Sequence, residues 1–160
     1  MKRFSSAAGI ALGVVIVLGL AGPVAAGEQV PFKGSLDGDV TRGAVHFPFV
    51  DVLVEGTGNA TQLGKFTFVF PHMVDVRFRT AAGTYSIVAA NGDTLKAHAT
   101  GLATPIPGTT VFYIEETATI TGGTGRFANA TGSFTIERWY DTATGETIGS
   151  FEGTISSPGR

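Results

Sequence analysis

The sequence predicts an all-β fold, an eight-stranded antiparallel up-and-down β-barrel. The first observation is composition: beyond residue 26 the chain has 19 glycines, 21 threonines and 11 phenylalanines. Glycine costs roughly 1 kcal/mol at a helix position and threonine is a mediocre helix former, so this composition disfavours a helical bundle. The second is that apolar and polar residues alternate with period two from residue 30 onward. The third is that glycine-rich turns recur at short intervals.

Eight segments carry this alternation or a run of β-branched and aromatic residues. They are 30–38, 49–57, 63–78, 82–90, 93–104, 110–121, 132–140 and 147–156. Asn91-Gly92 marks the clearest turn, because both central residues of a type I′ turn require positive φ. Residues 105–108 and 142–145 predict two more. Short connections favour pairing of consecutive strands, and closing the meander removes exposed edges. Eight strands leave room inside for side chains or one small ligand.

The N-terminal segment, residues 1–26, has the features of an export signal. Two basic residues precede an apolar run over residues 7–20, and small residues lead to a cleavage site expected before Gly27. The run is shorter than the roughly 20 residues of a membrane-spanning helix. We therefore expect residues 27–160 to fold as a single barrel domain, secreted or otherwise extracytoplasmic, with no membrane attachment once the signal is removed.

Charge and residue content argue against several functional classes. Removing the signal changes the formal net charge from −2 to −4, which argues against nucleic-acid binding. The chain has no cysteine, so a packed core must replace disulfides. Its three histidines lie far apart in sequence, and we expect neither a metal nor a cofactor. Residues 123–128 have the spacing of a dinucleotide fingerprint, but no helix follows to hold a pyrophosphate.

Three polar residues fall on strand faces that are otherwise apolar. In segment 63–78 the even positions from 66 onward are apolar apart from His72. Glu116 and Arg138 interrupt the apolar faces of their own segments in the same way. Alternate residues of a strand point to opposite sides of a sheet, so all three side chains are predicted to point inward. A buried charge must be paired, or it costs several kcal/mol.

Two interpretations of these residues remain open. In the first, Glu116, Arg138 and His72 line an interior ligand pocket, with Tyr85 or Tyr140 at its margin. In the second, Glu116 and Arg138 form a buried ion pair that fixes strand register, and His72 is a hydrogen-bonded core histidine. The segments that carry Glu116 and Arg138 are neighbours in a meander, so direct pairing fits both interpretations.

Residues 120–134, ITGGTGRFANATGSF, resemble the Gly-Gly-Thr-Gly-Arg-Phe turn of the barrel superfamily that includes allene oxide cyclases and dirigent proteins. Residues 91–95 and 58–67 are similar to segments of small exported bacterial proteins of the same superfamily. The resemblance implies a calycin-like, allene oxide cyclase-type barrel with an interior cavity. The known activities of the superfamily are stereocontrolled, either cyclising a fatty-acid epoxide or coupling phenolic radicals.

The part that matches is a turn, and the resemblance therefore implies a structural role for Gly122, Gly123, Gly125 and Arg126. We expect Arg126 to bind neighbouring backbone or carboxylate groups. The cysteine of plant cyclases has no counterpart in this chain, and no catalytic residue is carried over.

The leading functional hypothesis is a secreted barrel, without a cofactor, that binds a small apolar or phenolic ligand through Glu116, Arg138 and His72. The first alternative is an isomerase or cyclase with Glu116 or His72 as its acid-base group. The second is an interaction protein whose barrel is filled by its own phenylalanines. An open cavity that reaches His72 and Glu116 would favour ligand binding or catalysis. Homo-oligomerisation is left open.

Overall fold

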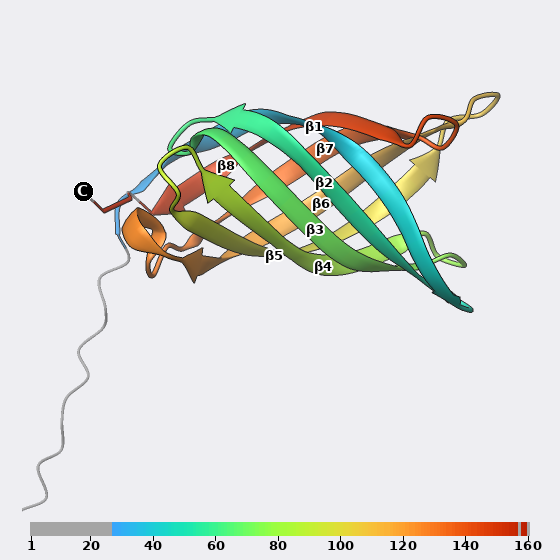
Figure 1. Ribbon diagram of the computed structural model, residues 1–160, viewed down its shortest axis with the longest axis horizontal. Helices are drawn as coiled ribbons and strands as arrows, with labels where there is room; N and C mark the ends of the chain where they lie inside the picture. Colours follow the sequence, from blue (N-terminus) through green and yellow to red (C-terminus); the bar gives the residue numbers. More distant parts are fainter. Residues whose placement is uncertain (1–26, 157, 160) are drawn as a thin grey trace, which may run out of the picture.

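The computed structural model describes residues 27–156 and 158–159, and these residues form one closed antiparallel barrel (Figure 1). Its strands are β1 (Gln29–His46), β2 (Phe49–Ala60), β3 (Gly64–Asp75), β4 (Thr80–Ala89), β5 (Thr94–Pro105), β6 (Val111–Gly123), β7 (Gly132–Asp141) and β8 (Glu146–Ser156). The predicted fold class is confirmed. The predicted export signal lies outside the described residues. No helix in the described part of the chain is long and apolar enough to cross a membrane.

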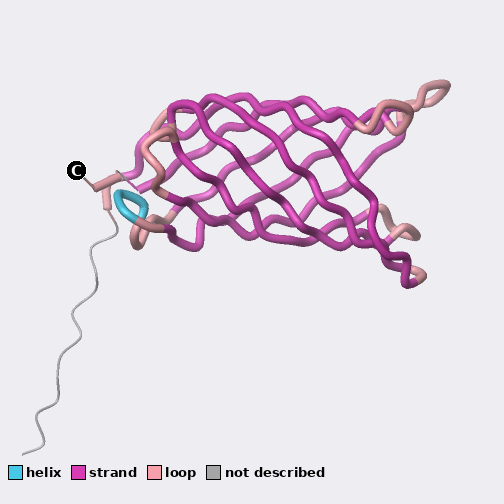
Figure 2. The backbone as a smooth tube through the Cα atoms, in the orientation of Figure 1, coloured by secondary structure: helices cyan, strands magenta, loops and turns pink. Residues whose placement is uncertain are grey.

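Each strand pairs with the next along the chain, and β1 pairs with β8 to close the barrel. The connections β1–β2, β3–β4, β5–β6 and β7–β8 therefore gather at one end, here called the mouth (right in Figure 1). The other three connections form the closed end. The short 3-10 helix η1 (Gly125–Phe127) lies there, between β6 and β7 (Figure 2).

Strand boundaries differ from the prediction at several places, and two of the differences at the mouth affect the site. β1 runs on to His46, whereas the predicted segment ended at 38. Its last residues are exposed and its register against β2 shifts between Arg42 and Val45, so they lack the alternation that marks a half-buried strand. β3 ends at Asp75 instead of continuing to 78. Phe78, predicted on the core face, lies in the β3–β4 turn and is 66% exposed.

Phenylalanine rings fill the half of the barrel nearer the closed end. Phe32 packs on Phe134 and Phe151 with both ring centroids at 5.1 Å, and Phe66 lies 6.2 Å from Phe151. Burying each ring contributes roughly 1.5–3 kcal/mol. Inward-facing glycines make the room: a Cβ on Gly58 would lie 2.2 Å from the ring of Phe66. The core that replaces disulfides is therefore a cluster of aromatic rings.

Candidate functional site

Glu116 and Arg138 form a buried ion pair in the middle of the barrel. They lie on the neighbouring strands β6 and β7, one pleat apart. Nη2 of Arg138 donates to Oε1 of Glu116 at 2.9 Å, and Nε donates to Oε2 at 3.2 Å. The side chain of Arg138 is only 3% exposed and that of Glu116 only 1%. This two-point contact is the strongest geometry for an arginine and a carboxylate, and it provides the pairing that a buried charge requires.

Tyr85 and Thr147 complete the hydrogen bonding of this pair. The Tyr85 hydroxyl donates to Oε2 of Glu116 at 2.7 Å. Nη1 of Arg138 donates to Oγ1 of Thr147 at 3.4 Å, and that hydroxyl donates to the carbonyl of Trp139. Within the described residues, every buried side-chain nitrogen and oxygen has a partner. These four residues are called the core network below.

Burial fixes the protonation of the core network. Removal from water raises the pKa of the Tyr85 phenol well above its ordinary value, and the negative charge of Glu116 raises it further. Burial acts to lower the pKa of Arg138, but the charges and hydrogen bonds of Glu116 and Tyr85 together outweigh this effect, so the pKa is raised. Tyr85 is therefore a neutral donor and Arg138 a permanent cation at physiological pH.

The three polar residues that the sequence placed on the inner face each lie opposite a glycine on an adjacent strand. The pairs are His72 with Gly83, Glu116 with Gly101 and Arg138 with Gly149. A Cβ on any of these glycines would lie 2.5 Å from a side-chain atom of its polar partner. The glycines leave the space that a long polar side chain needs inside a narrow barrel.

Between the core network and the mouth, the barrel encloses a cavity of about 230 Å³. Most of its wall is apolar, made by Val40, Val50, Val52, Val54, Val74, Val76, Ala103, Phe112 and Ile114. The polar groups that line it are Arg42, His72, Arg79, Arg138, Tyr140 and Thr142. No carboxylate of the described chain is among the lining residues. The cavity is thus an apolar chamber with a few polar groups, three of which are arginines.

His72 lies in the cavity wall and is held by β3. Its ring stacks on Phe70 with the centroids 4.3 Å apart, and Nδ1 lies 3.1 Å from the Phe70 carbonyl oxygen. A proton on Nδ1 is donated to that carbonyl, which leaves Nε2 as an acceptor. Burial lowers the pKa of His72, and nearby Arg138 lowers it further; the Phe70 carbonyl and Glu116 act in the opposite direction. The ring is therefore mainly neutral at pH 7.

Comparison with solved structures identifies the architecture. The pterocarpan synthase dirigent protein GePTS1 superposes with a TM-score of 0.51 and 17% identity, over 83% of this chain and 87% of that chain. The chain has the dirigent-type barrel fold. This confirms, for the fold, the resemblance deduced from the turn at residues 120–134. No protein-family model matches the chain, and no curated protein matches its sequence.

The dirigent-type barrel separates the predicted ligand residues into two groups. His72, Arg138 and Tyr140 line the cavity. Glu116 and Tyr85 do not; they are buried beside Arg138 and belong to the core network. The structure therefore joins the two interpretations of the sequence, because Glu116 and Arg138 form an ion pair while Arg138 and His72 also face a cavity.

Arg42 and Arg79 are cavity residues that the sequence did not indicate. Arg42 lies beyond the predicted end of the first strand, and Arg79 lies in a turn between two predicted strands. Parity along 40–42 would have placed Arg42 on the inner face had the strand been extended. Arg79 adopts a φ of +57°, a turn conformation that no sequence feature indicates for arginine.

The glycine-rich turn lies at the closed end, away from the cavity. Gly122 and Gly125 have φ values of +119° and +54°, which favour glycine. The Arg126 backbone N–H donates to Oδ2 of Asp93 at 3.1 Å, and its guanidinium donates to the carbonyl of Gln62. In this chain these contacts connect the β6–β7 connection to the β4–β5 connection through Asp93 and to the β2–β3 connection through Gln62.

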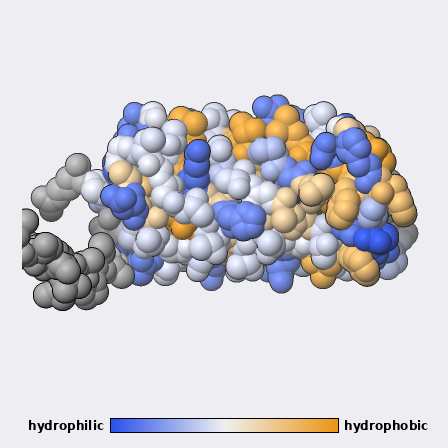
Figure 3. Space-filling view, turned by 90° about the horizontal axis from the view of Figure 1, so that it is seen from below, coloured by the Kyte–Doolittle hydropathy of each residue, from blue (hydrophilic) through white to orange (hydrophobic). Residues whose placement is uncertain are grey.

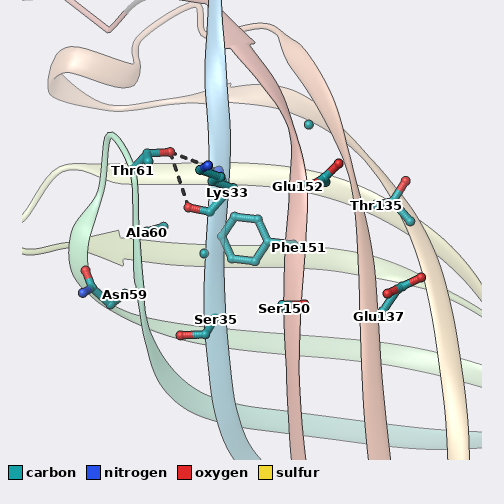
Figure 4. Close-up of a pocket in the computed structure, with 12 residues that line it drawn as sticks. Lys33, Ser35, Asn59, Ala60, Thr61, Thr135, Glu137, Ser150, Phe151 and Glu152 are labelled. Atoms are coloured by element: carbon teal, nitrogen blue, oxygen red, sulfur yellow. Dashed lines mark hydrogen bonds between the residues drawn. The ribbon is translucent and has the colours of Figure 1, made fainter.

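A wide hollow also lies on the outer wall, across β1, β2, β7 and β8 (Figure 4). Short polar side chains surround it, and the Thr61 hydroxyl accepts from the Lys33 backbone N–H at 3.0 Å and donates to the Pro31 carbonyl. It is an open surface depression, separate from the cavity. The described residues contain no group of three histidine, aspartate or glutamate side chains placed to hold a metal ion.

Proposed function

We propose that this protein, once exported, binds a small apolar or phenolic ligand in the cavity at the mouth of the barrel. The observation that carries the proposal is the 230 Å³ apolar chamber with a few convergent polar groups, the usual construction of a small-molecule site. An apolar cavity of about 150 Å³ holds a benzene molecule. The chamber therefore suits a ligand built on one substituted ring.

The polar groups assign an orientation to such a ligand. Nε2 of neutral His72 is free to accept a hydrogen bond from a phenol or alcohol, while the valines contact the apolar body. Arg138 is largely committed to Glu116 and Thr147, so it offers the ligand positive charge more than free donors. The ligand is thus expected to place its hydroxyl at the His72 side of the chamber.

An isomerase or cyclase is the second candidate, and the structure favours His72 over Glu116 as its acid-base group. His72 faces the cavity, and its lowered pKa keeps the ring neutral at pH 7, in the form that can accept a proton. Both oxygens of Glu116 are engaged by Arg138 and Tyr85, behind the cavity wall. A purely structural barrel is less well supported, since phenylalanines fill only the half nearer the closed end.

Native mass spectrometry of the purified protein, followed by identification of small molecules released on denaturation, tests the proposal. Val52 lies in the cavity wall, and Val52→Trp fills the chamber. Thr67→Trp places the same side chain on the exposed face of β3 and serves as the control. We expect a released ligand, or binding from a panel of substituted phenols, in the wild type and the control but not in Val52→Trp. Equal binding by all three proteins, or none by any, would refute the cavity as the site.

A further inference from the structure

The most exposed large apolar side chains gather at the mouth, on two adjacent hairpin tips. Val45 and Phe47 on the β1–β2 tip are 67% and 78% exposed, and Phe78 on the β3–β4 tip is 66% exposed. The Val76 N–H donates to the Pro48 carbonyl at 2.9 Å, which holds the tips side by side. Figure 1 shows the β1–β2 hairpin reaching past the barrel body at the lower right. Residues 45–49 and 76–79 are called the rim tips below.

Arginines accompany these apolar residues. Arg77 lies in the β3–β4 tip, pairs with Asp75 at 2.9 Å and has its guanidinium carbon 5.2 Å from the Phe78 ring centre. Arg42 lies just before the β1–β2 tip and Arg79 is the last residue of the β3–β4 tip, and neither forms a salt bridge in the described part of the chain. Figure 3 shows strongly hydrophobic and strongly hydrophilic surface side by side at this end of the molecule. Two cations without ion-pair partners next to exposed aromatic rings fit a partner that is both apolar and anionic.

We propose that the rim tips dock the barrel onto an anionic lipid bilayer. Phe47 and Phe78 enter the acyl region while Arg42 and Arg79 remain at the level of the lipid phosphates, as arginine side chains with apolar stems do. A protein interface of about 800 Å² per partner needs a broad surface, whereas these residues occupy two narrow projecting tips. The narrow tips and their arginines therefore suit insertion into an anionic bilayer better than binding to a broad protein surface.

The position of the cavity gives this docking a consequence. Arg42, Arg79 and Val76 line the cavity and also lie at or next to the rim tips. An apolar molecule that leaves the bilayer would enter the chamber without crossing bulk water. The inference departs from the sequence-based expectation of no membrane attachment. That expectation did not foresee the exposed rim tips, since the strand boundaries there were predicted differently.

Co-sedimentation with phosphatidylcholine vesicles, with and without phosphatidylglycerol, tests the inference. Residues 29–156 close the barrel, so the protein is used from Gly27 onward, which removes the apolar N-terminal segment as a competing lipid anchor. We expect binding to the phosphatidylglycerol vesicles that weakens with added salt. Phe47→Ser/Phe78→Ser should lower the partition coefficient about tenfold or more, since each substitution removes a large apolar side chain from the lipid. Arg42→Gln/Arg79→Gln should abolish the preference for phosphatidylglycerol.

Val69→Ser/Val88→Ser is the matched control, because both valines are exposed on the outer wall away from the mouth. It should bind vesicles as the wild type does. No binding by the wild type, or equal binding by the Phe47/Phe78 variant, would overturn the inference. A wild-type dimer that this variant converts to a monomer in sedimentation velocity would overturn it in favour of a second copy. Val52→Trp, which tests the cavity, should leave vesicle binding unchanged, so the two proposals fail separately.

Discussion

Glu116 of β6 lies directly opposite Gly101 of β5, and a Cβ at position 101 would sit 2.5 Å from Cγ of Glu116. The Glu116 side chain occupies the space that a side chain at position 101 would otherwise fill. His72 and Arg138 use Gly83 and Gly149 in the same way. The placement of these polar groups therefore depends on the strand register as much as on the polar residues themselves.

Gly101→Ala should destabilise the protein by about 1–3 kcal/mol, because the new methyl group displaces a buried, ion-paired side chain. The free energy of unfolding in urea measures the effect. Gly43→Ala is the control, since its Cβ would meet no atom closer than 3.4 Å. Equal stability of the Gly101 variant and wild type would show that Glu116 shifts at no cost.

Glu116→Ala should destabilise by roughly 3–5 kcal/mol, since it leaves the Arg138 guanidinium buried without a counter-charge. Thermal and urea unfolding measure the loss. Glu116→Ala combined with Arg138→Met should recover most of it, because no unpaired charge then remains. An unchanged melting temperature for the single variant would contradict the pairing.

Tyr85→Phe should cost about 1.5–3 kcal/mol, the usual range for a hydrogen bond to a charged group. Tyr113→Phe is the comparison, since Tyr113 donates to Glu137 on the exposed face and its loss should matter little.

Titration of tyrosine absorbance gives a second measurement of the Tyr85 environment. Because the pKa of Tyr85 is raised well above its usual value, one tyrosine should ionise only when the barrel unfolds. Full titration in the folded state would be the opposite result.

Stability should decline as the pH falls below about 6.5, and His72 should cause part of the decline. The pKa of His72 is lowered in the folded state from its ordinary value of 6.5. The unfolded chain therefore binds the proton first as the pH drops, and acid favours unfolding until the folded-state pKa is also passed. Urea midpoints between pH 8 and pH 5 should fall less in His72→Gln than in wild type. Parallel curves would show that His72 does not contribute.

Much of the fold and part of the site could be predicted from local sequence patterns. Alternation along 66–74, 112–120 and 134–140 determines which side chains point inward, and it placed His72, Glu116 and Arg138 on the inner face, where the structure also has them. It failed at the mouth, where residues 39–46 are exposed on a bulged strand and 76–79 form a turn. Alternation arises from one-sided burial, and these segments are not buried on one side.

The sequence alone determined an all-β chain of eight consecutive strands and three polar groups on the inner face, because strand periodicity and turn chemistry act over a few residues. Only the tertiary structure decided that His72, Arg138 and Tyr140 line the cavity, whereas Glu116 and Tyr85 lie inside the barrel but beyond the cavity, farther from the mouth. It also placed Arg42 and Arg79 at the same cavity. Those relations depend on strand register and on glycines opposite the large side chains. They join residues on different strands, and periodicity within one strand carries no information about them.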